Sequence, residues 1–145
     1  MSNVLAFPSP DAGAVISFEI AGDPVAFARA RSNGSRRFTP PKQRAAMTVI
    51  KDAAIKAKGK HHILQGPIAM QMIAVFAYPE SWPKYRKVEQ FKTSKPDVDN
   101  CAKLAADSCN GILYHDDAQI AVMSCVKKYG PQSKVIVTFH AIAGG

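Results

Sequence analysis

The sequence predicts a single compact α/β domain with a mixed β-sheet, two main helices and a C-terminal β-hairpin. Three observations support this: apolar segments of strand length, two stretches with apolar residues at every third or fourth position, and glycine or proline between them. A chain of 145 residues with 47% hydrophobic side chains can form one core without disulfides or a structural metal. Residues 1–13 are predicted to be a disordered tail before a single domain at 14–145.

The first half of the chain predicts a strand, a loop and a helix. Residues 15–20 alternate apolar and polar side chains, as a half-buried strand does. A basic loop follows, with Asn33 and Gly34 as its turn signal. A helix is predicted from a Thr39 cap, with Pro40 at its first position, to Gly59, because apolar residues recur there along one face.

The second half predicts one buried strand, a long loop, a helix and two final strands. Residues 68–78 are almost wholly apolar and too short for a buried helix, which favours a central strand. A polar loop with two prolines follows, and apolar spacing then predicts a helix over residues 100–110. The last two alternating segments, at 118–128 and 134–142, predict a hairpin around Gly130 and Pro131.

The positive charge of the chain is regional. The net charge is +8, and residues 24–60 hold ten Lys and Arg against one acid, Asp52. Such a surface attracts polyanions, so nucleic acid is the expected partner, although a merely soluble basic surface is the alternative. No apolar run approaches the ~20 residues of a membrane helix and no signal peptide is visible, so we expect a cytoplasmic protein without a membrane partner.

The cysteines and the aromatic residues suggest weaker hypotheses. Three cysteines without paired spacing fit buried thiols in a reducing compartment better than a zinc site. In the loop at 80–96, aromatic residues alternate with cations, including Lys84, Arg86 and Lys95. This mixture suits distorted or single-stranded nucleic acid, and equally suits rings that anchor the loop to the core.

Five of the eleven acids gather between Asp97 and Asp117, where Lys103 is the only Lys or Arg. Asp97 and Asp99 stand two positions apart beside Pro96, which predicts that their side chains point the same way. The predicted return of the chain after the helix would bring Asp116 and Asp117 alongside them. We therefore expect three or four carboxylates at one end of the sheet, with an ammonium beside them.

A cluster of oxygen ligands favours a hard cation such as Mg²⁺, for which Mn²⁺ can substitute, and no small-molecule cofactor is expected. Bound Mg²⁺ can generate a nucleophilic water, and a lysine can add charge at the phosphate, which together imply phosphodiester hydrolysis. The alternative is that these residues are helix caps, an exposed ion pair between Lys103 and Asp107, and a turn.

The whole stretch KPDVDNCAKLAADSCNGILYHDDAQI resembles the signature of the RusA family of Holliday junction resolvases, small phage and prophage endonucleases. The matching positions are Lys95, Pro96, Asp97, Asp99, Asn100, Lys103, Asp107, Asn110, Gly111, Tyr114, Asp116, Asp117, Gln119 and Ile120. The resemblance implies that Asp97, Asp99 and Asp117 are metal-binding catalytic aspartates, that Lys103 is the essential lysine, and that Asp116 is an auxiliary ligand. It also implies a homodimer acting on branched DNA in recombination and repair.

The upstream basic segment departs from the family pattern. Where the family often has Pro-Lys-Gly before two arginines, this chain has Ala26, Phe27 and Ala28, and only the arginines remain. The expected DNA contacts are Arg29, Arg31, Arg36 and Arg37, with Lys84, Arg86 and Lys95. Two alternatives stay open: a nuclease for forks, flaps or other branched DNA, and a catalytically silent DNA-binding module.

Overall fold

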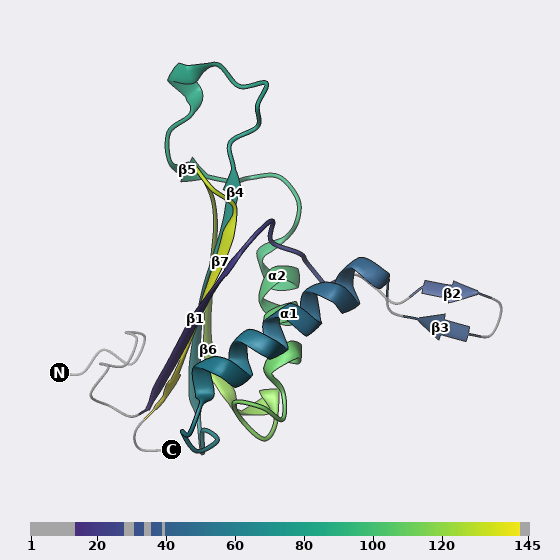
Figure 1. The fold of residues 1–145 in the computed structure, drawn as a ribbon, viewed down its shortest axis with the longest axis vertical. Coiled ribbons are helices and arrows are strands. Elements are labelled where there is room, and N and C mark those ends of the chain that lie inside the picture. The colour runs from purple at the N-terminus through teal and green to yellow at the C-terminus, as the bar shows by residue number, and fades with distance from the viewer. Residues whose placement is uncertain (1–13, 28–30, 34–35, 39, 143–145) are drawn as a thin grey trace.

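The computed structural model describes residues 14–27, 31–33, 36–38 and 40–142, with side chains described outside 31–38. The predicted tail at 1–13 and Thr39 lie outside the described residues. The elements, drawn in Figure 1, are β1 (Val15–Ala21), β2 (Arg31–Asn33), β3 (Arg36–Phe38), α1 (Pro41–Lys58), β4 (Ile68–Ala77), η2 (Lys84–Arg86), β5 (Gln90–Phe91), α2 (Val98–Cys109), η3 (Asp117–Gln119), β6 (Ile120–Gly130) and β7 (Lys134–Ala141). The fold is therefore one α/β domain, as predicted.

Five strands form one mixed sheet in the order β1-β7-β4-β6-β5. β4 and β6 are parallel and joined through α2, whereas β7 is antiparallel to both β4 and β1. The predicted C-terminal hairpin is wrong in its pairing: β6 and β7 follow one another in the chain, but β4 lies between them. The reason is that the long apolar β4 pairs on both edges and so takes the central position.

Both helices cover the same face of the sheet (Figure 1). Ile50 and Ala54 of α1 pack in one core with Leu104 of α2 and with Met72 and Phe139 of the sheet. Pro41 begins α1 at a position where its missing N–H is not needed, and Gly59 ends it with a positive φ of 51°. In the part of the chain that the structure describes, no helix is long and apolar enough to cross a membrane.

The basic segment predicted as a loop contains a short ribbon. β2 and β3 pair antiparallel around the predicted turn and project beyond the start of α1, away from the sheet (Figure 1). Arg31, Arg36 and Arg37 belong to these two strands, while Arg29 lies outside the described residues. The ribbon therefore carries much of the regional positive charge on a projecting arm.

Candidate active site

The predicted site residues gather along α2, on the side that faces the start of β6. A hollow of about 300 Å³ is lined there by acids, a lysine and apolar side chains: Asp99, Lys103, Ala106, Asp107, Asp117, Ile120, Ala121 and Met123. Asp99, Lys103 and Asp107 are four residues apart in turn, so they lie on one face of the helix. The structure thus brings three of the predicted site residues, Asp99, Lys103 and Asp117, to one hollow.

Asp97 faces a neighbouring hollow instead, together with Phe27, Lys95 and Asn100. The sequence predicts that Asp97 and Asp99 point the same way, which holds only for an extended backbone. The helix already begins at Val98 with Asp97 as its N-cap, and two positions on a helix differ by about 200° round its axis. Asp97 and Asp99 therefore line adjoining hollows.

The two hollows meet at a contact between Phe27 and Lys103. The Lys103 ammonium nitrogen lies 4.4 Å from the centroid of the Phe27 ring. The backbone N–H of Phe27 donates to the carbonyl oxygen of Asn100 at 2.9 Å, which fixes this segment against the first turn of α2. Within the described chain no ion pair joins Lys103 to Asp99 or Asp107, so the aromatic ring is what holds the ammonium.

Asp107 is a site residue that the sequence prediction did not include among the ligands. Hydrogen bonding to Asp116, then burial, then hydrogen bonding to Asp107 raise the pKa of Asp117. Such a shift indicates carboxyl groups close enough to share a proton, because two adjacent anions repel. The spacing of Asp107, four residues after Lys103 and eight after Asp99, is the signal that could have identified it.

Asp116 has a different environment although it is the next residue. It caps η3, and its carboxylate accepts a hydrogen bond from the backbone N–H of Ala118 at 3.1 Å. That bond is the main reason why the pKa of Asp116 lies below its usual value. Asp116 therefore acts as the turn-forming acid and Asp117 as the acid that faces the hollow.

Two buried or half-buried polar side chains fix this turn against the rest of the fold. Gln119 accepts hydrogen bonds from the backbone N–H groups of His115 and Asp116, at 2.8 and 3.1 Å, and donates to the carbonyls of Leu64 and Gly66. The buried Tyr114 hydroxyl donates to the carbonyl of Ala106 in α2 at 2.5 Å. These bonds set the position of Asp117 relative to Asp107.

Among the described residues, no three Asp, Glu, His or Cys side chains lie close enough together to form a ready-made metal site. The acids are instead spread along α2, since the eight residues from Asp99 to Asp107 span about 12 Å of helix. The donor set still fits a hard cation: it is made of carboxylate oxygens, and the neighbouring acids that raise the pKa of Asp117 would be stabilised by a positive ion among them. Cys101 and Cys109 are buried within the core.

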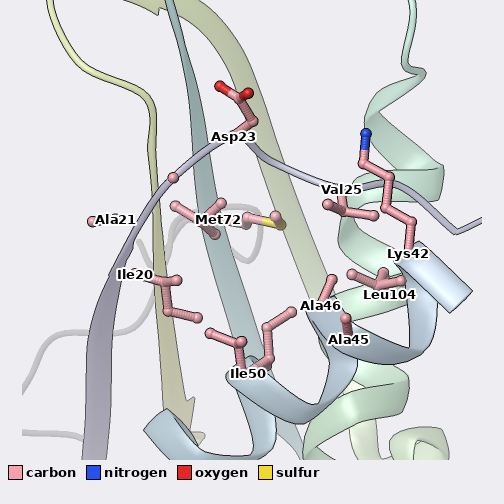
Figure 2. Close-up of a pocket in the computed structure, with 13 residues that line it drawn as sticks. Ile20, Ala21, Asp23, Val25, Lys42, Ala45, Ala46, Ile50, Met72 and Leu104 are labelled. Carbon is pink, nitrogen blue, oxygen red and sulfur yellow. The ribbon is translucent and has the colours of Figure 1, made fainter.

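A second cavity, of about 290 Å³, lies between β1, α1 and α2 and has a different character. Ile20, Ile50, Met72 and Leu104 point into it, whereas Asp23 and Lys42 stand at its rim (Figure 2). Asp23 is the one carboxylate among the described residues that line it. The lining is otherwise mainly apolar, so the candidate site is the hollow along α2, where several acids gather beside a lysine.

Apart from the arginines of the projecting arm, the cations predicted to meet nucleic acid lie in two places. Arg86 and Lys84 are in η2, in the loop that extends beyond one end of the sheet (Figure 1), and Lys95 lines the hollow beside Asp97. The Arg86 guanidinium carbon lies 3.8 Å from the centroid of the Trp82 ring, and Trp82 in turn packs against Tyr129. The aromatic residues thus anchor the loop and hold a cation at the same time.

Comparison with known proteins agrees with the arrangement along α2. A family model described as "Endodeoxyribonuclease RusA" matches residues 21–140, which is most of the chain. This chain belongs to the RusA family. It is also 28% identical, over 141 aligned residues, to a protein named "Uncharacterized protein YqaN" from Bacillus subtilis (strain 168), covering 88% of this chain and 97% of that protein. The RusA resemblance drawn from the sequence is confirmed, and the matched region includes Asp97, Asp107 and Asp117.

Proposed function

We propose that this RusA-family protein is a Mg²⁺-dependent endonuclease that resolves four-way DNA junctions by symmetric phosphodiester hydrolysis. The observation that supports it most is the hollow along α2, where Asp99, Asp107 and Asp117 accompany Lys103 in a chain of an endodeoxyribonuclease family. Clustered carboxylates beside an ammonium suit the binding of a cation and a phosphate together.

The roles of the side chains follow from their positions. Asp107 and Asp117 would hold the ion, with Asp99 from the same hollow and Asp97 from the adjoining one as further ligands. When bound, Mg²⁺ supplies an acidified water and positive charge beside the phosphate oxygens. The Lys103 ammonium, held over Phe27 between the two hollows, adds positive charge where negative charge grows on the phosphate.

DNA is expected to bind across the helix side of the molecule. Lys95 lies at the hollow beside Asp97, and Lys84 and Arg86 extend this positive charge toward the loop before β5. Tyr85 in the same loop is 85% exposed, so its ring is available for stacking on an unpaired base. Arg29, Arg31, Arg36 and Arg37 would contact phosphates from the projecting arm. Phosphate contacts give affinity, while junction shape gives selectivity.

Symmetric cleavage also calls for two equivalent sites. A four-way junction is resolved by two nicks in strands of like polarity, and a two-fold pair of subunits supplies two identical hollows at a fixed separation. We therefore include a homodimer in the proposed function.

The test is cleavage of a synthetic four-way junction compared with a linear duplex of the same sequence, each with Mg²⁺ and with EDTA. The proposal expects paired symmetric nicks in the junction alone, and only with Mg²⁺. Cutting of forks or flaps in preference to junctions would assign a different branched substrate. Junction binding without any cleavage would leave only a DNA-binding module.

A further inference from the structure

Two lysines are held together near the point where the chain passes from β5 to the start of α2 (Figure 1). Lys92 follows β5, and its ammonium donates to the Ser94 hydroxyl at 2.8 Å and to the Tyr129 hydroxyl at 3.1 Å. Lys127 lies on β6, and its ammonium donates to the backbone carbonyl of Ser94 at 2.7 Å. Both ammonium groups are thus fixed against one residue. We name Lys92, Ser94, Lys127 and Tyr129 the two-lysine site.

The two-lysine site has no carboxylate of its own. Among the described residues, the ion pairs involve other lysines, so neither Lys92 nor Lys127 pairs with an acid. Both side chains are half-buried, and two ammonium groups side by side repel each other. An ammonium has three N–H donors, and the bonds within the described chain leave one on Lys92 and two on Lys127 for a ligand. The site therefore offers donors and two positive charges to an anion.

Aromatic rings hold Lys92 in place without neutralising it. Its ammonium nitrogen lies 5.0 Å from the centroid of the Phe76 ring and 4.9 Å from that of the Tyr129 ring. The hydrogen bond from Lys92 is also the main reason why the pKa of Tyr129 lies below its usual value. Trp82 packs against Tyr129 in turn, with 4.6 Å between the ring centroids. A cation held by rings keeps its charge, and a site formed in advance loses less conformational entropy when a ligand binds.

The two-lysine site lies on the same side of the sheet as the α2 hollow. Side chains alternate along a strand, so Lys127 points to the same side of β6 as Met123, which lines that hollow. The four residues from Met123 to Lys127 span about 13 Å of strand. Burial raises the pKa of the Cys101 thiol in the first turn of α2, and the charge of Lys127 opposes that rise. Lys127 is therefore close to the end of α2 that carries Asp99.

We propose that the two-lysine site binds one backbone phosphate of the DNA strand whose scissile phosphate lies in the α2 hollow. Ammonium groups bind phosphate oxygens as point charges. One strand of duplex DNA advances about 3.4 Å per nucleotide along its axis, so about 13 Å corresponds to roughly four nucleotides. The site rests on the proposed function in that the bound strand is the one that is cut. Lys92 and Lys127 lie outside the stretch at 95–120 that matches the family pattern, so spacing within that stretch could not identify them.

Junction binding in EDTA tests the site separately from cleavage. The test variant is Lys92→Gln with Lys127→Gln. The matched control is Lys128→Gln with Lys134→Gln, which removes the same charge from lysines that pair with acids and line a hollow on the opposite side of the sheet. Both variants lower the net charge of +8 by two.

The test variant should raise the dissociation constant about tenfold and reduce the salt slope by about 1, because one phosphate contact is lost. The control should leave both nearly unchanged, because salt screens distant charges. Equal effects in the two variants would overturn the proposal. So would a slope reduced by about 2 in the test variant, because the lysines would then meet separate phosphates.

Anchoring of the loop is the other role that these lysines could have, and thermal unfolding separates the two roles. Anchoring predicts a test variant that unfolds at a lower temperature and keeps the wild-type salt slope. Phosphate binding predicts a reduced slope in a variant that unfolds near the wild-type temperature. If the double variant does not fold, Lys127→Gln alone decides, since its amide can still donate to the Ser94 carbonyl. It should bind junctions severalfold more weakly, and Lys127→Arg should restore binding; wild-type affinity in Lys127→Gln would overturn the proposal.

Neutral phosphate analogues locate the contact. A methylphosphonate is placed at one position at a time along the cut strand. About four nucleotides from the cut, it should weaken binding by the wild type about tenfold and leave binding by the test variant unchanged. No position with this dependence on the lysines would contradict the proposal, and inorganic phosphate that stabilises the wild type alone would then assign the site to a free anion. A wild type that shows the dependence but does not cut junctions would contradict the proposed function and leave the site standing.

Discussion

Replacing Phe27 with leucine should slow DNA cleavage without weakening DNA binding. The Lys103 ammonium lies 4.4 Å from the centroid of the Phe27 ring, and leucine keeps the bulk but removes the π-face. A cation–π contact contributes about 0.5 to 1 kcal/mol when exposed and about 2 kcal/mol when desolvated. Since 1.36 kcal/mol corresponds to a tenfold rate, the half-buried Phe27 predicts a cleavage step roughly 3 to 30 times slower.

The assay is single-turnover cleavage of a four-way junction with protein in excess, so that the rate reports the step after binding. Phe27→Trp keeps an aromatic face and should retain most of the rate. Phe76→Leu is the matched control, because Phe76 makes the same kind of contact with Lys92, at 5.0 Å, away from the α2 hollow. Equal slowing in Phe27→Leu and Phe76→Leu, or none in Phe27→Leu, would refute the positioning of Lys103 by Phe27.

Three further predictions concern the acids, the turn and the DNA surface. Because the pKa of Asp117 is raised in the folded protein, its protonated form adds stability at low pH, and that stability is lost as the pH rises through the raised pKa. In EDTA at pH 7, Asp117→Asn should therefore be more stable than the wild type by less than about 1 kcal/mol and unfold at a higher temperature, with the difference vanishing near pH 3. The same variant should cleave about a thousandfold more slowly. A lower unfolding temperature at pH 7 would contradict this. Tyr114→Phe removes a buried hydrogen bond to Ala106 and should lower the free energy of unfolding by about 1 kcal/mol in urea titrations. An unchanged urea midpoint would refute this prediction. Arg86→Ala should weaken junction binding and reduce the salt slope by about 1; an unchanged slope would remove Arg86 from the interface.

Periodicity predicted most elements of the fold. Apolar residues on one face predicted helices at 40–59 and 100–110, which correspond to α1 and α2, and alternation predicted β1 and β7 within one or two residues. The pairing of β6 with β4 was missed because periodicity says nothing about partners. Consecutive strands often pair, yet a strand, helix and strand in sequence also form a parallel crossover, and here the crossover is the arrangement found.

The candidate site was predictable in its residue types and less so in its geometry. Spacing correctly associated Asp99 with Lys103, because both lie on one face of a helix that was itself predicted. The orientation of Asp97 depends on whether the helix begins one residue earlier or later, and capping residues do not determine this. Phe27 comes from a distant segment, so its contact with Lys103 depends on tertiary packing that no local pattern records.

The central claim is that the carboxylates beside Lys103 bind a divalent cation, and calorimetric titration of Mn²⁺ tests it most directly. With uncleaved junction DNA present, the wild type should take up Mn²⁺, because a cation relieves the repulsion among the carboxylates that raises the pKa of Asp117. Asp117→Asn should lose that uptake, while Glu89→Gln, an acid that pairs with Lys128 away from the α2 hollow, should keep it. Absence of Mn²⁺ uptake by the wild type, or equal uptake by Asp117→Asn, would contradict the claim.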